Sequence, residues 1–260
     1  RSVLGLEAKN TAIVLADAAL DLTVNEILSG TLSFNGQRCT ALKMVYVHRD
    51  IFPQFIEKFS AAVDSLKPGM PWENGVGITP LPEENKAAYL DSLVQEAVSS
   101  GAKVMNGNGG KYHGSLFFPA VVCPVDSRMK LYHVEQFGPV IPVATFTDID
   151  EPLRYVIESN YGQQVSIFGT GPDEIAALVD PLVNQVARVN INSQCQRSPD
   201  TFPFTGRKDS AEGTLSVSDA LRVFSIRSLV AAKENHVNKE IITDIIRGNK
   251  SNFLSTDFIF

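Results

Sequence analysis

Residues 33–40 read Ser-Phe-Asn-Gly-Gln-Arg-Cys-Thr, and an apolar run, Met-Val-Tyr-Val, follows at 44–47. The Asn-Gly pair is a turn signal, and the apolar run is typical of a buried strand. Cys39 therefore lies between a loop and a rigid element, where a thiol can be presented to a substrate. The neighbouring guanidinium of Arg38 favours the thiolate, which is the nucleophilic form. Two interpretations are open: a nucleophile, or a half-buried cysteine near the end of a strand.

On both sides of this stretch, short apolar runs alternate with helical patterns. Strands are predicted at 13–15, 42–47, 116–122, 164–168 and 186–191, and helices at 22–32, 51–63, 82–98, 150–157 and 172–179. Such alternation indicates βαβ units with a parallel sheet. No internal repeat or clear linker interrupts the chain before residue 233, so we expect one α/β domain over residues 1–233.

Residues 234–260 form a separate C-terminal segment in this interpretation. Isoleucines at 241, 242, 245 and 246 lie on one helical face, and Gly248 can end the helix. The closing residues 253–260 are also rich in apolar side chains, which would prefer a surface to pack on. The helix either docks on its own domain or binds a partner, and both alternatives are open.

The composition of the 260 residues excludes several classes of protein. Apolar residues make up 44% and charged residues 20%, which is ordinary for a soluble globular protein. The net charge of −6, without a basic stripe, argues against a nucleic-acid role. We expect no membrane span either, because no apolar run reaches the roughly 18 residues that one needs.

Cysteine and histidine usage argues against a metal site. The three cysteines, at 39, 123 and 195, are far apart, and the four histidines are scattered. Unpaired cysteines fit a reducing compartment, either the cytoplasm or the interior of an organelle. The chain opens inside an apolar stretch with no visible targeting segment, so we expect a processed product, a fragment or part of something longer.

Four stretches follow one another in a recognisable order: 34–40, 135–140 (Glu-Gln-Phe-Gly-Pro-Val), 159–168 and 203–210 (Pro-Phe-Thr-Gly-Arg-Lys-Asp-Ser). Together they resemble the catalytic domain of the aldehyde dehydrogenase superfamily, over residues 3 to about 233. Residues 192–197 and 200–204 most resemble its NADP-dependent non-phosphorylating glyceraldehyde-3-phosphate dehydrogenases. The resemblance implies a mostly parallel sheet flanked by helices, and a late strand at 223–230 through which members form dimers and tetramers.

The same resemblance assigns roles to five residues. Cys39 would attack the aldehyde, and the resulting thioester would be hydrolysed. Glu135 would accept hydrogen bonds from the nicotinamide ribose, and Phe137 would pack beside the nicotinamide. Arg38 and Arg197 would bind the substrate phosphate, for which guanidinium suits bidentate hydrogen bonding. For each arginine a surface ion pair is the alternative.

Two departures from the family pattern bear on activity. The position of the glutamate that activates the deacylating water holds Gly5, which cannot take a proton. Glu7 stands two residues on, and in an extended strand it would point to the same side. The family's cofactor-binding half precedes the matched region, and no Gly-x-Gly-x-x-Gly motif occurs in this chain. NADP, or NAD, is therefore expected only if a cofactor-binding domain completes the site.

Two functions follow from these features. The first is the catalytic portion of an NAD(P)-dependent aldehyde dehydrogenase, inactive alone and completed by a cofactor-binding half. The second is a catalytically degenerate structural or interaction subunit of a larger homo- or hetero-oligomer, which Gly5 and the apolar tail favour. A stand-alone thiol hydrolase is weakly supported, because no histidine lies in a recognisable partner motif.

Overall fold

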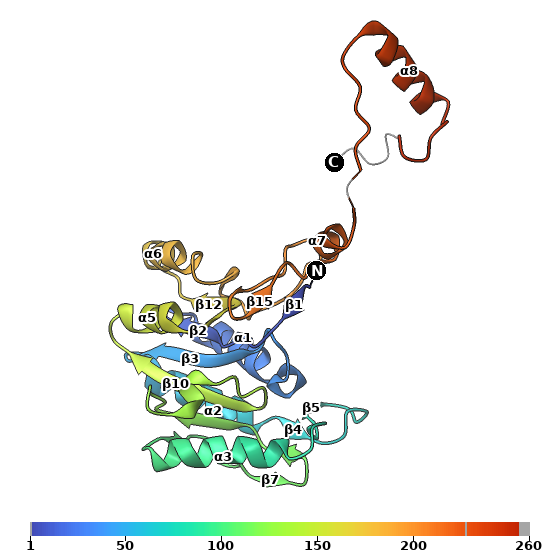
Figure 1. Cartoon of the computed structure of the whole chain (residues 1–260). Helices are drawn as coiled ribbons and strands as arrows, with labels where there is room; N and C mark the ends of the chain where they lie inside the picture. Colours follow the sequence, from blue (N-terminus) through green and yellow to red (C-terminus); the bar gives the residue numbers. More distant parts are fainter. Residues whose placement is uncertain (1, 227, 255–260) are drawn as a thin grey trace. The chain divides into compact units, whose positions relative to one another are not determined.

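A computed structural model describes residues 2–226 and 228–254, and it divides the chain into two compact units, Arg1–Leu221 and Arg222–Phe260 (Figure 1). The first unit contains the predicted sheet and the helices around it. The second contains the helix of the C-terminal segment. The domain limit expected at residue 233 lies inside the second unit.

A seven-stranded sheet forms the centre of the first unit, in the order β13-β12-β2-β3-β10-β9-β6. All neighbouring pairs are parallel except β6 with β9. The strands are β2 (Asn10–Val14), β3 (Leu42–His48), β6 (Lys103–Val104), β9 (Ala120–Cys123), β10 (Val140–Phe146), β12 (Gln164–Phe168) and β13 (Arg188–Ile191). Every residue of β2 and of β12 is buried, as expected for parallel strands covered on both faces.

Helices cover both faces of this sheet (Figure 1). The main helices of the first unit are α1 (Leu20–Leu32), α2 (Phe52–Asp64), α3 (Lys86–Ser99), α5 (Asp150–Glu158) and α6 (Pro172–Leu182), with the short α4 at Lys130–His133. Val14 packs with residues of α1 and α2, whereas Ile13 packs with residues of α5 and α6. This alternation along β2 is the two-residue period of a strand. The predicted α/β fold is confirmed.

Four two-stranded sheets join the remaining short strands. The first two pair β1 (Leu4–Gly5) with β15 (Ala211–Glu212), and β11 (Tyr161–Gly162) with β14 (Arg207–Lys208). The other two pair β4 (Lys67–Pro68) with β5 (Val76–Ile78), and β7 (Tyr112–His113) with β8 (Leu116–Phe117). The first two sheets attach the opening residues and the 203–212 loop to the rest of the unit.

Two predicted elements are interrupted or begin late. Pro119 separates β8 from β9 within the run predicted at 116–122, because proline cannot donate to a strand ladder. The helix predicted from residue 82 begins at Lys86, after Asn85 adopts a left-handed backbone with φ of 59°.

The late strand predicted at 223–230 is not formed in this structure. Val223 ends helix α7 (Val217–Val223), and residues 224–226 and 228–230 have no regular secondary structure; Arg227 lies outside the described residues. An edge strand is held by backbone hydrogen bonds to a neighbouring strand. The described chain provides no such neighbour here, and Ile226 and Leu229 are 90% and 87% exposed.

The second unit contains the predicted C-terminal helix, α8 (His236–Arg247). Its N-terminus is capped by Asn235, whose side chain accepts a hydrogen bond from the backbone of Asn238 at 2.8 Å, and Gly248 follows its end. None of its residues is buried. The closing apolar residues 258–260 lie outside the described residues. Among the helices that are described, none combines the length and the apolar character needed to cross a membrane.

A strained turn, η1 (Ser33–Gly36), connects α1 to Cys39. Phe34, Asn35 and Gly36 have φ values of 55°, 57° and 68°, three consecutive left-handed residues. The side chain of Asn35 holds the turn, because it donates to the Thr79 carbonyl at 3.1 Å and accepts from the Thr79 amide at 3.0 Å. A β-carbon on Gly36 would lie 2.7 Å from the carbonyl oxygen of Thr31 and 2.9 Å from that of Gly138. Only glycine fits this position.

Gly36→Ala should therefore destabilise the fold by more than backbone strain alone. Gly75 is a matched control, since its φ is 74° and a β-carbon there meets nothing within 4 Å. Left-handed strain costs about 1–2 kcal/mol per residue, which sets the expected loss for Gly75→Ala. Gly36→Ala should lose about 3 kcal/mol or more, because two carbonyls must also move. Urea unfolding measures both variants, and equal losses would show that the turn is not crowded.

Candidate active site

Four of the five predicted site residues, all except Arg197, come together at one edge of the sheet. Residues 5–9 precede β2, Cys39 precedes β3, and residues 135–137 precede β10. These three strands are neighbours and parallel, so their amino ends meet. Segments distant in the sequence therefore converge around Cys39.

The turn that carries Cys39 is held by the side chain of Asn10. Its Nδ2 donates to the carbonyl oxygens of Cys39 at 2.8 Å and Ala41 at 3.1 Å, while its Oδ1 accepts from the amide of Gln164 at 3.0 Å. Asn10 thus ties the turn to β12 as well as to β2. The thiol of Cys39 is partly exposed, as a nucleophile requires.

A buried lysine that the sequence analysis missed joins this turn to Glu135. The side chain of Lys43 is 2% exposed, and its Nζ lies 3.0 Å from Oε1 of Glu135. The same ammonium donates to the carbonyls of Arg38 at 2.9 Å and Cys39 at 3.0 Å. Burial lowers the pKa of Lys43, and the carboxylate of Glu135 raises it part of the way back. The available signal was a lysine inside the apolar run of β3.

A second buried lysine lies beside the first. Nζ of Lys9 donates to Oε1 of Gln136 at 2.6 Å. The pKa of Lys9 lies well below its ordinary value, mainly because burial penalises its charge and also because Lys43 is near. Gln136 in turn donates to the carbonyl of Lys43 at 3.1 Å and to that of Val140 at 2.7 Å. The Gln136 side chain therefore links all three converging segments.

Glu135 and Phe137 lie where the sequence predicts a cofactor contact. Oε1 of Glu135 accepts from the amide of Ala8 at 3.1 Å in addition to its pairing with Lys43. Its Oε2 receives no hydrogen bond from the described residues. Phe137 has a positive φ of 43°, and the ammonium groups of Lys43 and Lys86 each lie 5.8 Å from its ring centre. One carboxylate oxygen is thus left for a further donor.

The two predicted phosphate ligands differ in their surroundings. Arg38 donates from Nη2 to Oε1 of Gln194 at 2.8 Å, so the 192–197 segment does reach the Cys39 turn. Its buried Nε has no hydrogen-bond partner in the described part of the chain. Burial lowers the pKa of Arg38, and the thiols of Cys195 and Cys39 partly offset this. Arg197 is exposed and lies 5.1 Å from the ring centre of Phe204. Among the described residues neither arginine forms an ion pair.

Gly5, which stands where the resemblance places a general base, lines a hollow of about 510 Å³. Its lining includes Gly5, Glu7, Glu135 and Tyr161. The hydroxyl of Tyr161 donates to Oε2 of Glu7 at 2.7 Å. The carboxylate of Glu7 therefore already has a partner, and Gly5 has no side chain to offer.

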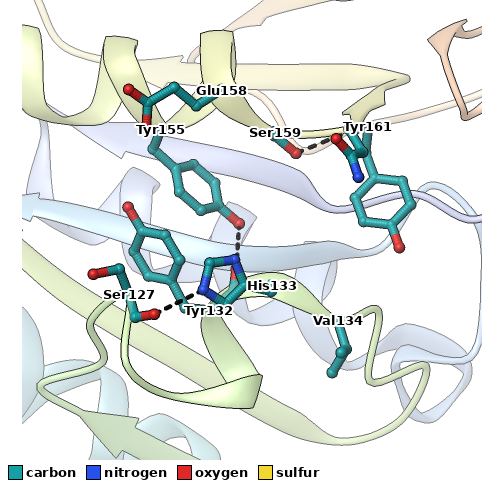
Figure 2. Close-up of a pocket in the computed structure, with 9 residues that line it drawn as sticks. Ser127, Tyr132, His133, Val134, Tyr155, Glu158, Ser159 and Tyr161 are labelled. Carbon is teal, nitrogen blue, oxygen red and sulfur yellow. Dashed lines mark hydrogen bonds between the residues drawn. The ribbon is translucent and has the colours of Figure 1, made fainter.

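An adjoining hollow of about 410 Å³ shares Asn160 and Tyr161 with the first (Figure 2). Tyrosine and histidine rings line much of it. Tyr155 donates from its hydroxyl to the carbonyl of Tyr132 at 3.0 Å, and the ring of His133 is bonded to the carbonyl of Ser127 at 2.8 Å. None of the five predicted site residues lines this second hollow.

Comparison with known proteins defines the class. A profile of the aldehyde dehydrogenase family matches residues 1–229. The chain belongs to the aldehyde dehydrogenase family. The NADP-dependent glyceraldehyde-3-phosphate dehydrogenase of Streptococcus equinus is 36% identical over 231 residues, which make up 89% of this chain and 46% of that protein. The protein of the same name from Arabidopsis thaliana is 34% identical over 220 residues, 85% of this chain and 43% of that protein.

A solved structure agrees with these sequence matches. The NADP-dependent glyceraldehyde-3-phosphate dehydrogenase of Bacillus halodurans, complexed with NADP, superposes with a TM-score of 0.79 at 37% identity. The match covers 84% of this chain and 45% of that one. The resemblance inferred from the four motifs is confirmed, and the chain spans about half the length of the relatives it matches.

Cys39 should be the thiol that iodoacetamide labels first at neutral pH. Cys123 and Cys195 are 4% and 0% exposed, and burial raises their pKa values to about 12 and about 11. The thiolate is the reactive form, so both should react slowly. Peptide mass spectrometry over a time course measures the three rates, with Cys39→Ser as the control. Labelling of Cys39 no faster than the other two would exclude it as the nucleophile.

Proposed function

We propose that this chain is the catalytic-domain portion of an enzyme that oxidises an aldehyde with NADP, and that glyceraldehyde-3-phosphate is its substrate. The observation that carries the proposal is the convergence of Cys39, Arg38 and Glu135 at the amino ends of β2, β3 and β10. The names of the relatives support the substrate and the cofactor.

The chemistry begins at Cys39. Its thiolate attacks the carbonyl carbon of the aldehyde and forms a thiohemiacetal, from which loss of hydride gives a thioester. Sulfur suits both steps, because it is a good nucleophile and a good leaving group. Water then attacks the thioester, releasing the carboxylic acid and regenerating the thiol. The turn that carries Cys39 is held by hydrogen bonds from Asn10 and Lys43.

The arginines supply the proposed contacts to the substrate phosphate. Arg38 lies next to Cys39 and has an unpaired Nε, and Arg197 belongs to the segment that Gln194 joins to it. Guanidinium groups bind phosphate through paired hydrogen bonds. An anion held on this side would present the aldehyde carbon of the same molecule to the thiol.

The residues of the cofactor contact fit a nicotinamide ribose. Oε2 of Glu135 has no other donor within the described residues, so it can accept from a vicinal diol. Phe137 offers an aromatic ring beside it. NADP, when bound, would accept the hydride that leaves the substrate.

Deacylation is the weak step of this chain. A general base contributes about 10²–10⁴-fold to a rate. Gly5 supplies none, and Glu7 is bonded to Tyr161. The thioester should therefore form more readily than it is hydrolysed.

Joining this chain to the cofactor-binding half of the Streptococcus equinus relative tests the proposal. With glyceraldehyde-3-phosphate and NADP, the joined protein should form one NADPH per Cys39 rapidly and then turn over slowly. Gly5→Glu should raise the steady rate roughly a hundredfold, because it restores a proton acceptor. The new β-carbon requires only a small movement of its neighbour, since the nearest atom is the flexible tip of Leu215 at 3.3 Å.

Two controls accompany this test. Cys39→Ser should abolish both the rapid phase and the turnover. The chain by itself should produce no NADPH, and measurable oxidation by it would contradict our interpretation of Gly5 and of the separate cofactor half. Absence of the rapid phase in the joined protein would contradict the proposed activity.

A second candidate function is an interaction subunit, and α8 favours it. Four isoleucines lie along this helix, yet none of its residues is buried. Ile241 is 51% exposed, and the other three isoleucines are only partly buried. A partly exposed apolar face of this kind is typical of a surface that binds another protein or a second copy. This proposal is compatible with the first, since a homo- or hetero-oligomer can contain a catalytic domain.

Deleting residues 234–260 should weaken association of the chain with itself or with a partner subunit, because it removes this face. Sedimentation over a concentration series measures the change. Replacing Ile241 and Ile245 by Asp should act like the deletion, whereas Thr243→Asp, on the opposite side of the helix, should not. An unchanged sedimentation profile in the deleted chain would show that the segment is not a docking element.

A further inference from the structure

Lys43 occupies an unusual position for a charged side chain. Its ammonium is buried and has four oxygen atoms around it: the carboxylate of Glu135 and the carbonyls of Arg38, Cys39 and Ala41, the last at 3.4 Å. The three carbonyls all belong to the turn that carries the thiol. An ammonium has three protons to donate, so this site uses its full capacity.

Arg38 does not have these contacts, although it is the cation next to Cys39 in the sequence. Its Nη2 donates to Gln194, on a different segment. No hydrogen bond joins its guanidinium to the 38–41 turn among the described residues. The cationic group that donates hydrogen bonds to the turn is therefore the ammonium of Lys43.

Glu135 gives the buried ammonium its counter-charge. An isolated ammonium in such surroundings would lose its proton, because burial disfavours the charged form. The carboxylate at 3.0 Å opposes this effect, and the amide of Ala8 fixes that carboxylate in place. Glu135 thus has a function within the protein that is separate from any contact with a cofactor.

We propose that Lys43 is a positioning residue, which fixes the geometry of the Cys39 turn and supplies the positive charge that supports its thiolate, with Glu135 as counter-ion. The inference rests on the proposed role of Cys39 as nucleophile. It adds a residue and a charge pair to that role, alongside the neighbouring guanidinium of Arg38.

Several titratable or charged groups surround this turn, and each belongs to a different segment: Arg38 on the turn itself, Lys43 at the start of β3, Glu135 before β10, Lys9 before β2, and Cys195 after β13. Lys9 provides the matched control. It is as buried as Lys43 and lies beside it, but its ammonium is bonded to Gln136 and not to the turn.

The test is the pH profile of alkylation of Cys39 by iodoacetamide, measured on the whole chain by peptide mass spectrometry. Lys43→Met should slow alkylation about tenfold at neutral pH and change its pH profile, as expected for loss of a nearby opposite charge. Lys43→Arg retains the charge and should recover most of the rate. Lys9→Met should change the profile of Cys39 much less than Lys43→Met does, because the Lys9 ammonium donates to Gln136 and not to the turn.

A variant that leaves Glu135 buried without a partner could lose stability, so a second variant is included. Lys43→Met combined with Glu135→Gln removes both charges of the pair, and it should still slow alkylation, although less. Equal shifts in the Lys43→Met and Lys9→Met proteins, or no shift in either, would overturn the proposal. The readout needs no turnover, so it is independent of whether the joined protein oxidises an aldehyde.

Discussion

The buried pair of Lys43 and Glu135 is the interaction on which the site depends. Bringing two charges out of water costs several kcal/mol per ion, and only close pairing with further hydrogen bonds offsets this. Here the further bonds come from the turn of Cys39 and from the amide of Ala8. The pair is therefore stable only when the amino ends of β2, β3 and β10 are in register. The pairing of Lys43 with Glu135 and the geometry of the Cys39 turn therefore depend on the same arrangement of strands.

Much of this arrangement can be predicted from local sequence. The fully buried strand β2 is marked by the short apolar run at 13–15, and the long helices between the strands show their period, so the parallel sheet follows. Cys39, Arg38 and Glu135 occur in motifs whose order identifies the family. The strand neighbours then explain why residues so far apart in the sequence converge.

Other features depend on tertiary contacts that no local pattern reveals. Lys9 and Lys43 would ordinarily be exposed, and only the surrounding carbonyls and carboxylate make their burial possible. The bond of Tyr161 to Glu7 depends on the pairing of β11 with β14, which brings residue 161 to the site. The late strand at 223–230 was predicted from resemblance, but a strand exists only where another strand accepts its hydrogen bonds.

The contacts that build the site join residues distant in the chain: 127 residues separate Ala8 from Glu135, 154 separate Glu7 from Tyr161, and 156 separate Arg38 from Gln194. Closing such long loops has an entropic cost that must be met before the contacts form, and parallel sheets are slow to assemble for this reason. The edge that holds Cys39 therefore forms only together with the central sheet, whose β2–β12 pairing joins equally distant residues. A partly folded chain that lacks the central sheet would have no organised thiol.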